Sequence, residues 1–325
     1  MAVLVLTLTA GCSLQSGSTS SSGSTTQTFE SGTGSLTLSC EDPIPLSSGG
    51  VDLVAAAEGV WVLGTGDRSG AQLSLMADSD VVRSVTVGIA PRAVVMGGDS
   101  IWVANGSGLG PVYGGGATGP GYPSEHSLAR IKRTSGALLN EYPVEDPVDI
   151  GFGHGYVWIV APGMVLRLDP ASNEPPSTVI SLPEMTSGRI DFTTNYVWVL
   201  ADDRPILVRI NPQDLMTTLV TVEQSGGLAG RRDEIWLFSD DGIMALNEET
   251  LTRTATFEGP FAYGLAANNL GVWVVDAENM AHLIDGAQPP ANPCELVEPP
   301  IATSLVDDHA WFLGEHGLMS VELRP

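Results

Sequence analysis

The segment YVWVLA at residues 196–201 is the pattern that decides the fold of this chain of 325 residues. Six other segments share its form, an apolar strand with tryptophan at the third position: GVWVLG (59–64), SIWVAN (100–105), YVWIVA (156–161), EIWLFS (234–239), GVWVVD (271–276) and HAWFLG (309–314). All seven tryptophans lie in these segments, at spacings of 41, 56, 40, 38, 37 and 38 residues. Short strands repeated with a period near 40 residues are typical of β-propeller blades. We therefore predict an all-β, seven-bladed propeller of four-stranded antiparallel blades over residues 35–325.

The unit around the fourth tryptophan shows how a repeat supplies four strands. We expect strands at 187–193, 196–201, 206–210 and 218–223, with Asn, Asp and Pro in the turns between them. The third strands of three repeats read LARIK, VLRLD and LVRIN, which places Arg130, Arg167 and Arg209 in register. Their stems should cover apolar surface between blades while the charged heads stay in water. The tryptophans should pack between neighbouring blades, where each buries about 150–250 Å².

The last repeat contains only three strands, at 301–304, 310–314 and 318–322. The segment SLTLSCE at residues 35–41 is a strand without a repeat of its own, so we predict that it joins the outer edge of the last blade and closes the ring. Cys40 would then lie near Cys294 of the sixth blade. Either the two form a disulfide or they are separate thiols, because a sequence does not give the Cα separation that a bridge requires.

The first 34 residues predict where in the cell the protein is located. Residues 2–10 have the length of a signal-peptide hydrophobic region and are too short to span a bilayer. The segment LTAGC at 8–12 resembles a lipobox, so we expect residues 1–11 to be a lipoprotein signal peptide and Cys12 to carry the lipid. A frayed terminus around a buried cysteine is the alternative. Residues 12–34 should be a tether, since 17 of the 22 residues from 13 to 34 are Ser, Thr or Gly.

The net charge of the chain excludes some classes of binding partner. The chain has 14 Lys and Arg against 38 Asp and Glu, which gives a net charge of −24. This charge argues against nucleic acid and against adhesion to anionic lipid through a basic patch. Membrane contact should therefore come from the lipid anchor alone, and a ligand is expected to be cationic. Nearly all of the basic residues are arginine and not lysine, which is typical of a protein from a GC-rich bacterial genome. We expect a monomer that is extracytoplasmic and anchored to the cell membrane.

The (I/V)W(V/I) strand, the later L-x-R-(I/L)-(D/N) segment and the period resemble the YVTN-type and virginiamycin-B-lyase-like seven-bladed propellers over residues 35–325. The resemblance implies the same fold. Lyases of that group are metal-dependent and use acidic and histidine groups, so it also implies an alternative function. No segment matches their motif closely enough to carry a catalytic residue over. The pair Glu315 and His316 is explained equally well by a hairpin turn at 314–317.

Two features could form a binding face. The connection at 105–127, which accounts for the 56-residue spacing and carries Tyr113 and Tyr122, either covers the mouth of the channel or is a glycine-rich insertion. The turns between second and third strands carry acids, namely Asp67, Asp202, Asp203, Asp240, Asp241, Asp276, Glu278 and Glu315. Such a ring attracts cations, and its oxygen ligands suit Ca²⁺ or Mg²⁺.

The turns between first and second strands, on the opposite face of the propeller, weaken the case for a metal site. They carry a comparable set of acids, namely Glu58, Asp99, Asp233, Glu234, Asp307 and Asp308, so we expect no cofactor and leave a divalent cation open. Nucleophile motifs and zinc-ligand spacings are also missing from the sequence. We therefore expect a non-enzymatic scaffold that binds a ligand or a protein. A metal-dependent lyase or hydrolase with its site at the channel mouth is the alternative, and a purely structural envelope protein is a third hypothesis.

Overall fold

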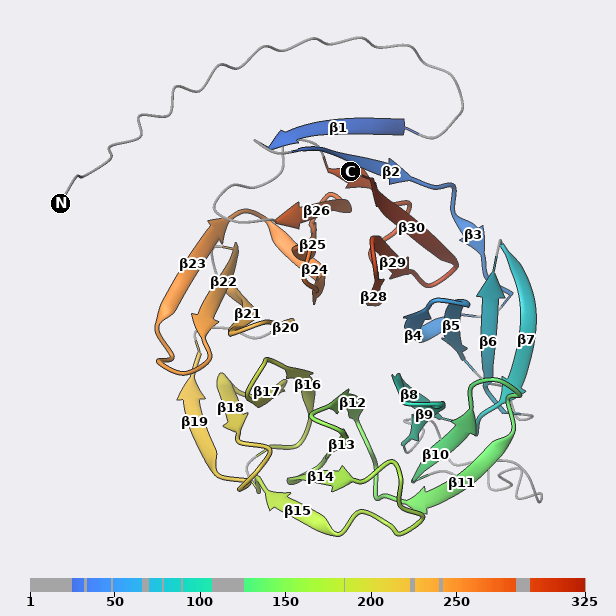
Figure 1. The fold of residues 1–325 in the computed structure, drawn as a ribbon, viewed down its shortest axis with the longest axis vertical. Coiled ribbons are helices and arrows are strands. Elements are labelled where there is room, and N and C mark those ends of the chain that lie inside the picture. The colour runs from blue at the N-terminus through green and yellow to red at the C-terminus, as the bar shows by residue number, and fades with distance from the viewer. Residues whose placement is uncertain are drawn as a thin grey trace, which may run out of the picture.

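The computed structural model describes residues 25–31, 34–47, 49–65, 70–77, 79–88, 90–106, 126–183, 185–222, 226–239, 242–284 and 293–324. These residues form seven antiparallel sheets arranged in a ring around a central opening (Figure 1). Six sheets have four strands and the seventh has six. The prediction of a seven-bladed β-propeller is therefore confirmed. Within the described ranges there is no helix that is long and apolar enough to cross a membrane.

The blades follow one another in chain order, and the first strand of each lies nearest the opening (Figure 1). Blade 1 contains β4 (Gly50–Ala56), β5 (Gly59–Gly64), β6 (Gln72–Ala77) and β7 (Asp80–Thr86). Blade 2 contains β8 (Pro91–Gly97), β9 (Ser100–Asn105), β10 (Ser127–Lys132) and β11 (Leu138–Pro143). Blade 3 contains β12 (Asp149–Gly153), β13 (Tyr156–Ala161), β14 (Met164–Leu168) and β15 (Thr178–Ser181).

The remaining blades repeat this order. Blade 4 contains β16 (Gly188–Phe192), β17 (Val197–Ala201), β18 (Ile206–Ile210) and β19 (Thr217–Thr221). Blade 5 contains β20 (Leu228–Arg231), β21 (Glu234–Ser239), β22 (Gly242–Asn247) and β23 (Arg253–Glu258). Blade 6 contains β24 (Phe261–Ala267), β25 (Val272–Asp276), β26 (Met280–Ile284) and β27 (Cys294–Glu295). Blade 7 contains β28 (Ala302–Val306), β29 (His309–Leu313) and β30 (Gly317–Arg324).

Each junction between blades has its own apolar core, and a tryptophan lies in each. Trp158 of β13, for example, packs in one cluster with Val197 and Val199 of the next blade. Six of the seven tryptophan side chains are at most 3% exposed, and Trp311 is partly buried. The expectation that the tryptophans pack between blades is confirmed. The arginine register is also confirmed, since Arg130, Arg167 and Arg209 lie directly opposite tryptophans on the neighbouring strand.

The N-terminal part of the chain completes blade 7. The strand β2 (Gly34–Cys40) pairs antiparallel with β30, and β3 (Ile44–Pro45) pairs with the start of β30. The strand β1 (Thr25–Ser31), which lies in the segment expected to be a tether, pairs with β2. The edge of β2 would otherwise present unpaired N–H and C=O groups, which any extended segment can satisfy. Residues 1–24, with the predicted signal peptide and Cys12, lie outside the described residues.

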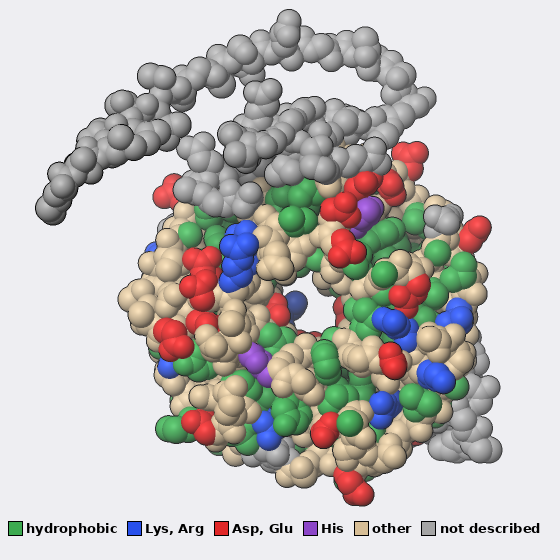
Figure 2. Space-filling view, in the orientation of Figure 1, with side chains coloured by type: hydrophobic (Ala, Val, Ile, Leu, Met, Phe, Trp, Pro, Cys, Tyr) green, Lys and Arg blue, Asp and Glu red, His purple; other side chains and the backbone are tan. Residues whose placement is uncertain are grey.

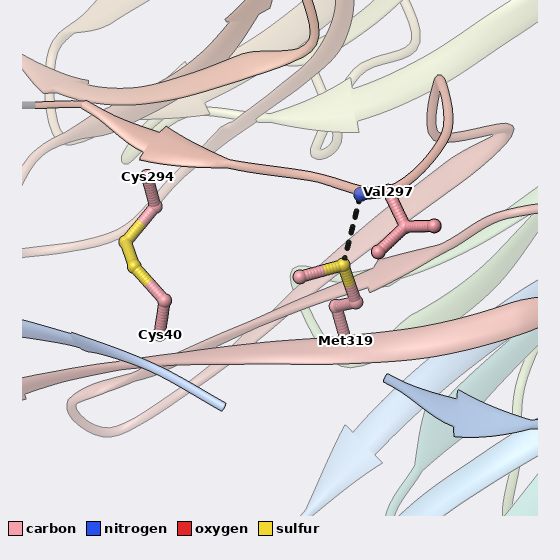
Figure 3. Close-up of a disulfide and its surroundings, with 4 residues drawn as sticks. All are labelled: Cys40, Cys294, Val297 and Met319. Atoms are coloured by element: carbon pink, nitrogen blue, oxygen red, sulfur yellow. Dashed lines mark hydrogen bonds between the residues drawn. A yellow bond between two sulfur atoms is a disulfide. The ribbon is translucent and has the colours of Figure 1, made fainter. Parts of the chain in front are cut away.

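A disulfide joins the N-terminal strand to blade 6. Cys40 at the end of β2 bonds to Cys294 at the start of β27, with the Cα atoms 6.1 Å apart (Figure 3). This separation lies within the range that a disulfide requires. The bridge closes a loop with a sequence separation of 254 residues, for which the chain-entropy model gives about 5 kcal/mol of stabilisation. It ties the two ends of the propeller together.

Candidate functional site

Antiparallel pairing places the turns between second and third strands on the same face as the blade-to-blade connections; this is called the connection face below. Asp202 and Asp203 lie there, between β17 and β18. Asp202 accepts a hydrogen bond from the Ser187 hydroxyl, and Asp203 accepts one from the Thr186 hydroxyl, both at 2.7 Å. Arg189 lies 3.6 Å from Asp202. The hydrogen bond from Thr186 holds the pKa of Asp203 below its ordinary value. These two acids fasten the connection that precedes β16.

Glu315 and His316 lie in the turn between β29 and β30 and are both exposed. The partner of His316 is Glu298, in the connection before β28. One oxygen of Glu298 accepts the backbone N–H groups of His316 and Gly317, each at 2.9 Å, and the other lies 3.4 Å from the His316 ring. Burial raises the pKa of Glu298, but the bonds from His316 and Gly317 outweigh it, so the pKa lies below its ordinary value. Glu298 therefore stays ionised at neutral pH.

Two further acids of this ring, Asp276 and Glu278, lie at the end of β25 and in the turn after it. Glu278 is exposed, and Asp276 is held by local hydrogen bonds. Asp276 accepts a hydrogen bond from His282 at 2.8 Å and two from backbone N–H groups of its own turn. Burial raises its pKa, but these bonds outweigh it and lower the net value. Five predicted site residues, Asp67, Tyr113, Tyr122, Asp240 and Asp241, lie outside the described residues. On the face in Figure 2, acidic side chains are spread around the ring, and the described residues contain no group of three metal-ligating side chains.

Carboxylates on the inner strands form a second set, which the sequence analysis did not predict because these acids lie within strands and not in turns. Asp52 of β4, Asp149 of β12 and Asp191 of β16 each accept a backbone N–H from the inner strand of the next blade. The donors are Val94 at 2.7 Å, Ile190 at 2.9 Å and Gly230 at 3.0 Å. The second oxygen of each accepts the N–H of the following residue in its own strand. Ser304 does the same with its hydroxyl oxygen, which accepts the N–H of Ala55 across the closing junction.

These carboxylates titrate near neutral pH. Burial raises the pKa of Asp52 and Asp149 to about 7 and that of Asp191 to about 6. The charge of Asp52 also raises the pKa of Asp149, and the Arg189 guanidinium lowers both. Such values are found at catalytic sites, but here one oxygen of each carboxylate already accepts a hydrogen bond from the next blade. The other oxygen accepts one from its own strand. An Asp within the inner-strand segments VDLV, VDIG and RIDF was the sequence signal for them.

The connection face also carries a pocket of about 370 Å³ between blades 6 and 7, called the connection-face pocket below. Three segments form it, and the lining residues are Pro43, Pro45, Leu296, Val297, Glu298, Pro300, Phe312, Gly314, His316, Gly317 and Met319. The N–H of Val297 donates to the Met319 sulfur at 3.3 Å, which holds the connection on β30 (Figure 3). The lining is apolar apart from Glu298 and His316. This combination of an apolar wall and a few oriented polar groups is typical of a ligand site.

Comparison with known proteins supports the fold. No protein-family model and no curated protein sequence matches the chain. A streptogramin B lyase structure matches with a TM-score of 0.65 and 16% identity over 89% of this chain and 98% of that one. Virginiamycin B lyase from Staphylococcus aureus matches with a TM-score of 0.64 and 13% identity, over 89% of this chain and 100% of that one. BamB from Moraxella catarrhalis matches with a TM-score of 0.57 and 12% identity, also over 89% of this chain and 100% of that one. At these identities the likeness shows a shared propeller fold and nothing about chemistry.

Proposed function

We propose that this protein is a lipid-anchored, extracytoplasmic scaffold that binds a ligand or a protein partner on the connection face without chemical change. The connection-face pocket is the observation that carries the proposal. Its volume of about 370 Å³ falls within the range of small-molecule sites, which also accommodate the anchoring side chains of protein partners. The rigid closed ring supports such a role because it holds the three lining segments in place.

The chemistry of the pocket indicates the kind of ligand. Proline, leucine, valine and phenylalanine side chains line it and favour an apolar group. Glu298 is held ionised by its hydrogen bonds, and the chain carries a net charge of −24. We therefore propose a ligand with an apolar body and a cationic end, which the field of the protein attracts.

The proposed location rests on the N-terminal segment and on cysteine use. The lipobox-like LTAGC supports an anchor at Cys12, and the Ser-, Thr- and Gly-rich residues 13–24 that precede β1 support a spacer. The disulfide between Cys40 and Cys294 fits an oxidising compartment outside the cytoplasm. We propose that the anchored protein acts as a monomer and does not bind nucleic acid.

Site-specific photo-cross-linking in cells tests the binding role. A photoreactive residue replaces Val297, which lines the pocket and is 69% exposed, and in a matched control replaces Leu219 of blade 4, which is 66% exposed. We expect a discrete cross-linked product from position 297 that is absent from position 219 and that Pro300→Arg abolishes. The same products from both positions, or none from position 297, would count against the proposal.

A metal-dependent lyase or hydrolase at the channel mouth is the second candidate. The near-neutral pKa values of Asp52 and Asp149 favour it, since acid–base groups work best near the ambient pH. It requires at least one histidine and two carboxylates that converge at the axis. Calorimetric titration with Ca²⁺, Mg²⁺ and Mn²⁺ tests it: stoichiometric binding that is lost in the Asp52→Asn, Asp149→Asn double variant would favour the enzyme. No binding by the wild type would favour the scaffold.

A further inference from the structure

The aromatic surfaces beside the second strands are covered by arginine in four blades. Three of these arginines come from the third strand, directly opposite the tryptophan: Arg130 lies 5.2 Å from the Trp102 ring centroid, Arg167 5.7 Å from Trp158, and Arg209 4.6 Å from Tyr196. In blade 1, Arg83 of the fourth strand lies 6.0 Å from Trp61. A guanidinium over an aromatic ring is attracted by the ring quadrupole. Each blade of this group therefore supplies its own cation.

In three of these blades the guanidinium also reaches the next blade. Arg83 donates to the backbone carbonyl of Arg133 at 2.9 Å, and Arg167 donates to that of Pro212 at 2.7 Å. Arg209 donates to the carbonyl oxygens of Glu248 and Glu249. All of these carbonyls lie in the turn between the third and fourth strands of the following blade. A guanidinium slot thus lies between the aromatic strand of one blade and this turn of the next.

Blade 7 lacks the arginine that would fill its slot. Ser320 is the residue of β30 opposite Trp311, and its side chain is too short to cover the indole ring. Trp311 is the one tryptophan that is only partly buried. A cavity of about 550 Å³ is lined by Trp311 and by Met76, Ala77 and Ser79 at the turn between β6 and β7 of blade 1. This cavity occupies the place that the guanidinium fills at the junctions after blades 1, 3 and 4; it is called the seventh slot below.

The charged residues that line the seventh slot are acids and one histidine: Glu41, Glu58, Asp307, Asp308 and His309. Glu41 accepts a hydrogen bond from the Ser320 hydroxyl at 2.7 Å, so a carboxylate stands beside the position of the missing arginine. Glu58 forms an ion pair with Arg133 at 3.3 Å, and Asp308 lies 2.7 Å from the His309 ring. Within the part of the chain that the structure describes, Glu41 and Asp307 form no ion pair with a basic side chain. The slot is therefore both aromatic and negatively charged.

We propose that the seventh slot binds a guanidinium group supplied by another molecule. A guanidinium fits better than an ammonium because it is planar, stacks on aromatic faces and donates to carboxylates through a fixed fork. The same aromatic strand and turn already hold a guanidinium elsewhere in this ring. The site lies at the turns of the face opposite the connection-face pocket, so this inference goes beyond the proposed function and stands independently of it.

Isothermal titration calorimetry of the full chain tests the proposal with four probes. These are N-acetyl-arginine amide, its neutral isostere N-acetyl-citrulline amide, N-acetyl-lysine amide and the peptide Gly-Arg-Gly. We expect saturable one-to-one binding of the arginine probe, at least tenfold weaker binding of the lysine probe and no binding of the citrulline probe. A tighter Gly-Arg-Gly complex identifies a polypeptide as the source of the guanidinium, and equal affinity identifies a free guanidino compound.

Variants localise the binding. Ser320→Arg places an arginine at the position that Arg167 and Arg209 occupy in their blades, so it should fill the slot and abolish binding. Glu41→Gln keeps an acceptor for Ser320 and removes the charge, and we expect at least fivefold weaker binding. Glu174→Gln, at an exposed turn residue of blade 3, is the matched control and should bind like the wild type. Cross-linking from position 297 should be unchanged in Ser320→Arg, which separates this site from the connection-face pocket.

Three results would overturn the proposal. They are the absence of saturable binding by either arginine probe, equal binding of the citrulline or lysine probe, and unchanged affinity in both Ser320→Arg and Glu41→Gln. Circular dichroism and the melting temperature show which variants are folded. If only one of the two is folded, unchanged affinity in that variant alone overturns the proposal.

Discussion

The carboxylate of Asp149 in blade 3 accepts the backbone N–H of Ile190 in blade 4 at 2.9 Å, and burial raises the pKa of this carboxyl to about 7. The same arrangement joins Asp52 to Val94 and Asp191 to Gly230. The inner strands of a propeller meet only along short lines near the axis. The inner edge of each blade carries backbone N–H groups that do not pair with a strand of the neighbouring blade. A carboxylate oxygen of the neighbouring inner strand satisfies one of these donors.

These carboxyls predict that the protein is more stable at mildly acidic than at alkaline pH. Their folded-state pKa values of about 6 to 7 lie above the ordinary value of 3.8, so between these limits the folded state binds more protons than the unfolded state. The stability they contribute is present at low pH and is lost as the pH rises through about 7. The melting temperature should therefore fall as the pH rises from about 5 to about 8.

The double variant Asp52→Asn, Asp149→Asn is the control for this trend, because it removes two of the titrating groups. Its melting temperature should depend less steeply on pH than that of the wild type in calorimetric scans. A slope identical to the wild type would show that other groups cause the trend. Glu298 and Asp276 act in the opposite sense, since their lowered pKa values contribute stability that is lost when the pH falls below their ordinary values.

Loss of the disulfide should destabilise the ring. The paired Cys40→Ser, Cys294→Ser variant releases a loop with a sequence separation of 254 residues, and chain entropy sets the expected loss at about 5 kcal/mol, with strain reducing it. Denaturant unfolding under non-reducing conditions measures the difference. Cys12→Ser, outside the bridge, should unfold like the wild type, and equal stability of all three proteins would contradict the prediction.

Truncation tests how blade 7 is completed. Removal of residues 13–24 should leave stability unchanged. Removal of 13–34, which takes away β1 and only the first residue of β2, should cost little. Removal of 13–45 eliminates β2 and β3, exposes the edge of β30 and should lower the melting temperature strongly. The last truncation also removes Cys40, so it is compared with the Cys40→Ser, Cys294→Ser variant. If these two proteins melt at the same temperature, the strands themselves contribute nothing to closure.

The tryptophans should differ in their contribution to stability. Trp158 is fully buried between blades 3 and 4, and its replacement by alanine should cost about 3–5 kcal/mol. Trp311 is partly buried and lines a cavity, so Trp311→Ala should cost clearly less. Urea unfolding of both variants measures the two losses. A loss at Trp311 that equals or exceeds the loss at Trp158 would contradict the idea that the seventh slot is open.

Much of the fold was predictable because each repeat contains the same short pattern of residues. Each second strand must bury a large side chain against the next blade, so tryptophan recurs at every repeat and its spacing counts the blades. The repeat likewise predicted that Arg130, Arg167 and Arg209 are in register with one another, whereas the strand pairing of the structure showed that each lies opposite a tryptophan. The candidate site was less predictable. Acids in turns are visible in a sequence, but Asp202 and Asp203 proved to bind a neighbouring connection through Ser187 and Thr186.

The sequence by itself determined the number of blades, the role of the tryptophans and the strand left over for blade 7, because these depend on residues close together in the chain. The tertiary structure decided which side chains from distant parts of the chain contact one another. Asp149 and Ile190 are 41 positions apart, and the connection-face pocket brings Pro43 beside Phe312 and Leu296. Ser320 is unremarkable in the sequence. The closed ring places Trp311 against the first blade. Because the side chain of Ser320 is short, a slot stays open between them.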